Sequence, residues 1–256
     1  MACIIATKNE AGPGNRILCR INLLAYARRH GHRLRCCGVP EIVDDLDVDF
    51  SEGTAKEPRK MHGLYLGSRE LEGLRLSHLE QRAIAREYLS PRLLIEPTPF
   101  PPDAVLIVLR GSECLSNPRY FRPPVPFYRA VIRDNGFAKV FYCQVGGGGN
   151  QCGKALEKEF SAKRFCASVQ RTAPSPYLEF GSYAAEFRAC LGARHLCFGT
   201  STFPWAAALL AVDEKTLYLP ADRQSVLSGN MPGFGEVVYY GLRKDGYNKR
   251  FSWRRI

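Results

Sequence analysis

The sequence of 256 residues has no apolar run approaching the roughly twenty residues that a membrane-spanning helix needs. It also has no basic N-terminal segment followed by an apolar one, the pattern of a secretion leader. With 45% hydrophobic and 24% charged residues, its composition is that of an ordinary globular protein. We therefore expect a soluble, cytoplasmic protein, or a soluble part of a longer one.

Paired cysteine motifs are missing too. None of the ten cysteines forms a Cys-x-x-Cys pair, and the five histidines are not spaced with cysteine partners as in a zinc site. Most of the cysteines stand in apolar segments, where free thiols behave as small hydrophobic residues. In a chain of this size we expect reduced thiols rather than a disulfide framework.

Long runs of one charge sign are absent, although the balance is basic. Lys and Arg number 36 against 25 Asp and Glu, which gives a net charge of +11. Such an excess favours anionic partners, namely nucleic acid, a membrane surface or a phosphorylated small molecule. Apart from Lys249-Arg250 and Arg254-Arg255 the cations are scattered, and scattered charge suits a nucleotide-type ligand at least as well as nucleic acid.

The first part of the chain predicts a βα unit followed by irregular segments. The expected elements are a strand (2–7), a glycine-rich turn (8–15), a helix (16–30), a strand (33–37), an acidic loop (41–50), a polar loop (51–61) and an amphipathic helix (76–89). Four prolines between residues 96 and 102 predict a stiff linker. We place a domain boundary there, between residues 96 and 97.

Beyond the linker, apolar strands alternate with helices. Strands are expected at 104–110, 138–145, 164–169, 196–198 and 217–219, the last being the final strand of this series, and helices at 127–133, 151–160, 183–191 and 204–212. This alternation predicts a parallel sheet buried on both faces, with ligands at the carboxyl ends of its strands. The rule selects Arg110, the loop 146–150 with Gly146 and Gly147, and the turn formed by Thr200, Ser201 and Thr202. A short strand at 237–240 follows, and the basic end of the chain has no assigned function.

The turn between the strand 196–198 and the next helix has two interpretations. Free backbone N–H groups and the helix dipole make a helix start after a strand an anion site. Ser and Thr are also the ordinary N-cap residues. Arg110 is open to two interpretations as well, because a cation that ends an apolar strand reaches solvent or meets an anion, for which its planar guanidinium is suited.

Two short motifs indicate other functions. Gly148–Lys154 fits the phosphate-binding pattern GxxxxGK, but Ala155 lacks the hydroxyl that would hold Mg²⁺, and a glycine-rich βα turn is the favoured interpretation. Overlapping Asp-x-Asp triplets occur in the acidic loop, where Asp47 and Asp49 would hold a divalent ion in one glycosyltransferase architecture. Such triplets are weak indications in an acidic loop.

Three further side chains are candidates by type and place. Glu10 and Glu113 lie in loops beside the expected ligand crevice, where either carboxylate can serve as a general base. Asn15 follows Gly12-Pro13-Gly14 and either caps its helix or presents its amide to a sugar or phosphate.

Three separated stretches resemble the fucosyltransferase-like glycosyltransferases of the α1,2-, α1,6- and protein-O-fucosyltransferase group. Residues 12–15 and the helix that ends Ala-Arg-Arg-His-Gly are similar to the family's Gly-x-Gly-Asn loop and following helix. Residues 105–113 are similar to the strand that ends His-x-Arg-Arg-Gly-Asp, with Val108, Gly111 and Glu113 in place of the His, the second Arg and the Asp. Residues 196–210 are similar to the family's Ser-Thr-Phe block, with 201–207 in register.

The resemblance implies an α/β protein of GT-B type, in which two Rossmann-like domains turn their parallel sheets toward a cleft. Residues 1–96 would form the acceptor-side domain and residues 97–256 the donor-binding domain. The implied activity is inverting transfer of a sugar, first of all L-fucose from GDP-fucose, to a hydroxyl of a glycan or glycoconjugate. No metal or other cofactor, nucleic-acid partner or membrane span is expected.

The resemblance also implies roles for single residues. Arg110 would hold the β-phosphate of the donor and help GDP to leave, and Glu113 or Glu10 would accept the proton of the acceptor. The donor-binding set is Arg110, Gly146, Gly147, Thr200, Ser201, Thr202 and Phe203. Gly12, Gly14 and Asn15 would face the donor–acceptor cleft.

Because the His and the second Arg of the family are replaced, another nucleotide sugar stays open as the donor. A metal-dependent variant that uses Asp47 and Asp49 is a second alternative. The alternative from another class is a nucleotide- or nucleic-acid-binding protein that uses residues 148–154.

Overall fold

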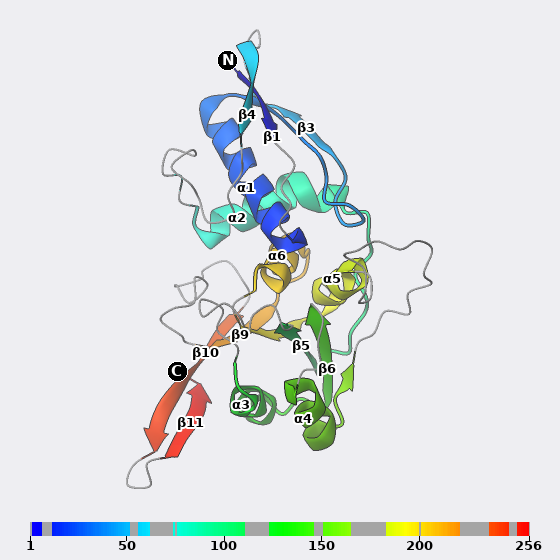
Figure 1. Ribbon diagram of the computed structural model, residues 1–256, viewed down its shortest axis with the longest axis vertical. Coiled ribbons are helices and arrows are strands. Elements are labelled where there is room, and N and C mark those ends of the chain that lie inside the picture. The colour runs from blue at the N-terminus through cyan, green and yellow to red at the C-terminus, as the bar shows by residue number, and fades with distance from the viewer. Residues whose placement is uncertain are drawn as a thin grey trace. The chain divides into compact units, whose positions relative to one another are not determined.

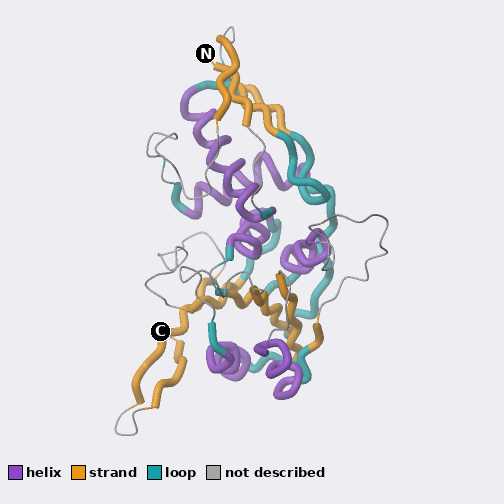
Figure 2. Tube along the Cα trace, in the orientation of Figure 1, coloured by secondary structure: helices purple, strands orange, loops and turns teal. Residues whose placement is uncertain are grey.

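The computed structural model describes residues 2–6, 12–51, 56–61, 74, 76–110, 123–145, 151–164, 183–199, 201–220, 236–245 and 250–255 (Figures 1 and 2). The chain divides into two compact units. The N-terminal unit comprises Met1–Glu96 and Trp205–Val212, and the C-terminal unit comprises Pro97–Pro204 and Asp213–Ile256. The chain therefore passes from the first unit to the second at the proline-rich stretch. It returns to the first unit for residues 205–212 and then continues in the second.

The N-terminal unit contains a sheet of four short strands. These are β1 (Ala2–Ala6), β2 (Arg33–Cys36), β3 (Leu46–Asp49) and β4 (Lys56–Met61). Their order is β3-β2-β1-β4, in which β1 is parallel to β2 and β4, and β3 is antiparallel to β2. The strands predicted at 2–7 and 33–37 are confirmed.

The loops predicted over residues 41–61 are wrong, because β3 and β4 lie there. Both are edge strands of the sheet, and an edge strand needs few apolar residues to hold its place. In β3 only Leu46 is buried, while Asp47 and Asp49 are exposed. In β4, Pro58 lacks an N–H donor, which an edge position tolerates.

The helices of this unit have ends that their sequences explain. Helix α1 (Pro13–His30) begins three residues before the predicted start, since proline suits the first turn of a helix. It ends as predicted at Gly31, whose left-handed conformation (φ 59°) lets its N–H bond to the last turn. The predicted helix at 76–89 is confirmed as α2 (His78–Ile84), which begins with a capping box formed by Ser77 and Glu80. It continues through a π-helical turn (Ala85–Leu89) and a 3₁₀ turn (Ser90–Arg92).

The C-terminal unit contains a sheet of order β11-β10-β9-β8-β5-β6-β7, in which every neighbouring pair is parallel except β10 and β11. The strands are β5 (Ala104–Arg110), β6 (Lys139–Val145), β7 (Lys163–Arg164), β8 (His195–Phe198), β9 (Thr216–Pro220), β10 (Glu236–Asp245) and β11 (Arg250–Arg255). The predicted α/β class is confirmed, and the parallel sheet is compatible with a Rossmann-like fold.

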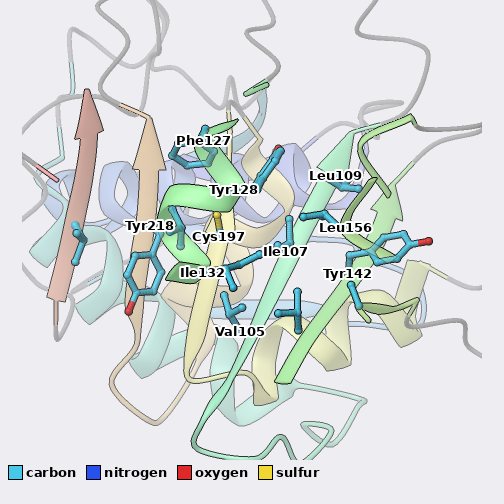
Figure 3. Packing of buried hydrophobic residues seen from close by; sticks show 14 residues of the cluster. Val105, Ile107, Leu109, Phe127, Tyr128, Ile132, Tyr142, Leu156, Cys197 and Tyr218 are labelled. Carbon is cyan, nitrogen blue, oxygen red and sulfur yellow. The ribbon is translucent and has the colours of Figure 1, made fainter. Parts of the chain in front are cut away.

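Helices α3 (Val125–Asn135) and α4 (Gln151–Phe160) cover one face of this sheet, and α5 (Tyr183–Gly192) lies on the other. Helix α6 (Thr202–Leu210) follows β8, and from Trp205 on it belongs to the N-terminal unit. Alternate residues of β5 and β6 pack with α3 and α4 in one core cluster, which includes Ile107, Tyr142, Phe127 and Leu156 (Figure 3). On the other face the Cys143 thiol of β6 is hydrogen-bonded to the Cys190 thiol of α5.

Several bounds differ from the predictions. Helix α6 begins two residues before the predicted residue 204, because a proline in the first turn is compatible with a helix. Residues 217–219 do not form the final strand, because β10 and β11 follow them in the same sheet. Strand β10 is also longer than the short strand predicted at 237–240. The first half of β10 pairs with β9 and the second half with β11, so these two strands form a hairpin (Figure 1, orange to red). Of the strand predicted at 164–169, residues after Arg164 lie outside the described part.

The seven cysteines whose side chains are described are free thiols, and five of these are buried (Cys19, Cys36, Cys143, Cys190 and Cys197). This agrees with the expectation of small apolar core residues. Within the part of the chain that the structure describes, no helix combines the length and the apolar character needed to cross a membrane.

Candidate functional site

The carboxyl ends of three adjacent strands of the C-terminal unit form the candidate site. β5 lies between β8 and β6, with Val108 opposite Phe198 and Arg110 opposite Val145. Because these strands are parallel, all three ends meet at one edge of the sheet, where doubly wound proteins bind ligands. Arg110 is the last residue of β5, and its backbone lies at this edge.

The junction between β8 and α6 adds a helix start to the same edge. Ser201 directly precedes α6 and is 4% exposed, and Phe203 in the first turn is 5% exposed. The Phe203 ring contacts that of Phe187 in α5 edge-on, with 5.2 Å between centroids. The first N–H groups of any α-helix have no partner within the helix, so this turn can bind an anion.

The other end of α6 belongs to the N-terminal unit and makes contacts within that unit. The Arg86 guanidinium donates to the carbonyl oxygens of Ala211 (3.1 Å from Nη2) and Val212, and Ser90 Oγ donates to that of Leu210 (2.8 Å). These bonds satisfy carbonyl groups that the end of a helix leaves free. Nearer the start of α6, the His78 ring packs edge-on against Trp205, with 4.8 Å between centroids. Helix α6 therefore has partners within the N-terminal unit from Trp205 to its C-terminal end.

The other predicted cleft residues lie at the start of α1 in the N-terminal unit. Gly12 is the N-cap and is exposed, Gly14 is buried, and Asn15 is half-buried. The capping role considered for Asn15 is wrong, because Asn15 is the third residue of the helix and the cap makes no side-chain hydrogen bond.

Five predicted site residues lie outside the described part of the chain: Glu10, Glu113, Gly146, Gly147 and Thr200. Of the predicted donor-binding set, the structure thus brings together the end of β5 at Arg110 and the helix start at Ser201, Thr202 and Phe203.

The GxxxxGK motif has a structural explanation in its last glycine. Gly153 lies in the first turn of α4, where a Cβ atom would come within 2.9 Å of the Tyr142 ring on β6. Glycine is required there for the close approach of helix and strand. Lys154 is exposed.

The acidic stretch also has local partners. Asp47 on β3 accepts bonds from Arg33 (2.8 Å) and Arg35 (3.0 Å) on the neighbouring strand, and the Arg33 bond in particular lowers the pKa of its carboxyl. The side chain and backbone of Ser51 bond to Asp49 and lower the pKa of Asp49. Among the described residues no group of three or more His, Cys, Asp and Glu side chains is placed to hold a metal ion.

One carboxylate at the candidate edge was not predicted. Glu186 lies in the first turn of α5, and the backbone N–H of Gln144, one residue before the end of β6, donates to it. Burial raises the pKa of Glu186 to about 7, against the opposing effects of the Arg164 charge and the Gln144 bond. No sequence pattern indicates this, since a glutamate in a first turn is typical of exposed helices; its burial depends on how α5 packs on β6.

A separate pocket of about 350 Å³ lies in the N-terminal unit, between α1 and α2, and is lined by Ala25, Arg28, Arg29, Leu76, Glu80, Ala83 and Ile84. Its α1 residues belong to the last turns of that helix. They lie roughly 15 to 21 Å along the helix axis from Asn15, at about 1.5 Å per residue. This pocket therefore does not coincide with the predicted cleft residues.

The chain matches none of the protein-family models and none of the curated proteins with which it was compared. The assignment of function accordingly depends on the geometry of this edge and on the sequence motifs that lie there.

Proposed function

We propose that the protein is a cytoplasmic, metal-independent, inverting glycosyltransferase of GT-B type. It transfers a sugar, with L-fucose from GDP-fucose as the leading donor, to a hydroxyl of a glycan or glycoconjugate. The N-terminal unit binds the acceptor and the C-terminal unit binds the nucleotide sugar. The proposal combines the resemblance of the three motifs with the position of two of them in the structure.

One observation carries the proposal. Two of the motifs lie about ninety residues apart in the sequence. They are the strand end at Arg110 and the block that begins at Ser201. In the structure both lie at one edge of the sheet, on neighbouring strands. A cation and a helix start on adjacent parallel strands are what recognition of a diphosphate requires, because both stabilise negative charge.

This arrangement suits the departure of a nucleoside diphosphate. When the bond between the anomeric carbon and the phosphate oxygen breaks, its electron pair stays on the diphosphate. Arg110 and the N–H groups of α6 stabilise that charge without Mg²⁺. The acceptor oxygen attacks from the opposite side of the sugar ring, through an oxocarbenium-like transition state, and inverts the anomeric centre.

The test is a thermal-shift measurement with a panel of nucleotides and nucleotide sugars in EDTA. We expect GDP and GDP-fucose to raise the melting temperature by several degrees at about 100 times the Kd, where binding adds about 2.7 kcal/mol. Arg110→Ala should remove most of this shift. Arg194→Ala is the matched control, because Arg194 is exposed and directly precedes β8, at the amino edge of the same sheet; it should keep the full shift.

Other outcomes point to the alternatives. A shift with ATP that needs Mg²⁺ and disappears in Lys154→Ala would contradict the proposal in favour of a phosphate-binding loop. Metal-dependent donor hydrolysis that Asp47→Ala abolishes would favour the metal-dependent variant. A shift with a nucleotide sugar other than GDP-fucose, again lost in Arg110→Ala, would keep the site and change the donor.

A further inference from the structure

Glu186 lies at the same edge of the sheet as the strand end at Arg110. Its carboxylate accepts from the N–H of Gln144, and Gln144 lies opposite Leu109, the residue before Arg110. With strands about 4.8 Å apart and a hydrogen bond of about 3 Å, the carboxylate is within roughly 10 Å of the Arg110 backbone. A sugar bound through its phosphate to that strand end would lie within reach of the carboxylate.

The packing of α5 fixes this position. Glu186 and Cys190 are four residues apart and so share one side of the helix, and the Cys190 thiol is hydrogen-bonded to the Cys143 thiol on β6. Phe187, beside Glu186, contacts Phe203 in the first turn of α6. The first turns of α5 and α6 therefore lie together on one face of the sheet, with the carboxylate on the β6 side and the helix start of α6 on the β8 side.

Among the described residues, two titratable side chains interact electrostatically with Glu186, namely Arg164 and Cys143. Arg164 on β7 is the cation whose charge favours the ionised carboxylate. Cys143 is the titratable neighbour on β6, and its pKa is raised well above its usual range by the bond to Cys190 and by burial, so that it stays neutral near pH 7. A half-buried carboxylate with one cation and one neutral thiol nearby exchanges its proton near neutrality, which suits a general base.

We propose that Glu186 is the general base of the transfer. The ionised carboxylate takes the proton of the acceptor hydroxyl while the acceptor oxygen forms its bond to the anomeric carbon. The bond from that carbon to the donor phosphate breaks, and GDP leaves with the electron pair. The products are the glycoside, GDP and the protonated Glu186, which returns its proton to solvent. This inference rests on the proposed function and names the base that the function requires.

Kinetics of Glu186→Gln provide the test. We expect kcat to fall by 10²- to 10⁴-fold, the usual contribution of a general base, while the thermal shift caused by GDP stays unchanged. Glu214→Gln is the matched control, since Glu214 is exposed in the turn before β9, at the amino edge of the sheet. It should leave kcat and the shift unaltered.

The pH profile separates a base from a structural role. In the unaltered protein kcat/KM should rise with pH through about 7 as Glu186 ionises. Arg164→Gln removes the charge that lowers the pKa of Glu186, and the rising limb should move to higher pH. In Glu186→Gln this limb should be lost.

The outcomes distinguish the two proposals. Activity of Glu186→Gln within threefold of the unaltered protein, with the same rising limb, would overturn the role of Glu186 and leave the glycosyltransferase assignment standing. Absence of transfer and of nucleotide-induced shifts in the unaltered protein would overturn the proposed function, and the base with it.

Discussion

The N-terminal and C-terminal units both build a sheet around a parallel pair of strands, but they bury these strands differently. In β5, residues 104–109 are all at most 2% exposed, because side chains on both faces are covered. In β2 only Leu34 and Cys36 are buried, and Arg33 and Arg35 pair with Asp47 on the open face. One sheet is the middle layer of its unit, and the other has a face that remains in contact with water.

This difference indicates where each unit tolerates change. A sheet covered on both faces exposes only its edges, so the strand ends at Arg110 and Phe198 are where a ligand can reach it. A sheet with one open face carries charges there without loss of its core.

The largest effects should come from two glycines at which the chain approaches itself closely. A Cβ at Gly192, the end of α5, would lie 1.7 Å from the carbonyl oxygen of Thr98, and one at Gly38 would lie 2.1 Å from that of Val43. We expect Gly192→Ala to lower the free energy of unfolding by about 3 kcal/mol or more, because Thr98 is also bonded to Arg188 and backbone must shift. Gly38→Ala should cost less, since its turn is partly exposed.

Urea unfolding measures these differences. Gly12→Ala is the control, because a Cβ there meets no atom within 4 Å; it should stay within about 0.5 kcal/mol of the unaltered protein. Equal stability of Gly192→Ala and Gly12→Ala would contradict the packing of the linker against α5.

An intermediate effect should appear in the pH dependence of stability. The pKa of Glu186 is raised to about 7 by burial, from 4.5 in the unfolded chain. Between these values the folded protein binds more protons than the unfolded one, so stability falls as pH rises from 4.5 to 7. Glu186→Gln lacks this pH dependence. Its free energy of unfolding, relative to that of the unaltered protein, should therefore rise by about 2 kcal/mol between pH 5 and pH 8, after allowance for partial exposure.

Chemical denaturation at pH 5 and pH 8 gives this difference without any activity assay. A difference between the two proteins that is the same at both pH values would show that the carboxylate is not buried in the folded state.

The smallest effect should come from the open face of the N-terminal sheet. Asp47→Asn removes the charge that Arg33 and Arg35 share, but these side chains are exposed, and such pairs contribute less than about 1 kcal/mol. Because the pKa of Asp47 is lowered in the folded state, what stability it adds is present above its unfolded pKa and is lost as pH falls. The loss should shrink at high salt. A loss of several kcal/mol in thermal or urea unfolding would contradict this account of the acidic stretch.

The same contrast explains how much the sequence could predict. The strand at 104–110 and the helix at 151–160 were predicted with their observed bounds, because continuous apolar runs and helical spacing identify elements of a covered sheet. β3 and β4 were missed, since edge strands with polar residues are held by pairing with β2 and β1 rather than by an apolar pattern.

The candidate site also contains residues that the sequence pointed to and one that it did not. The strand rule and the Ser-Thr-Phe motif located the edge at Arg110 and Ser201. The sequence did not point to Glu186, the proposed base, because its burial arises from the contact of α5 with β6 and leaves no local signal in the sequence.

We propose that the carboxyl edge of the C-terminal sheet binds the diphosphate of a nucleotide. Hydrogen–deuterium exchange with and without GDP, in EDTA, measures this binding at the backbone itself, because the bound phosphates would engage N–H groups at this edge. We predict slower exchange in peptides that cover the end of β5 and the first turn of α6, with no change over β2 and β3. Protection confined to the start of α4, or no protection at the β5 and α6 positions, would contradict the claim.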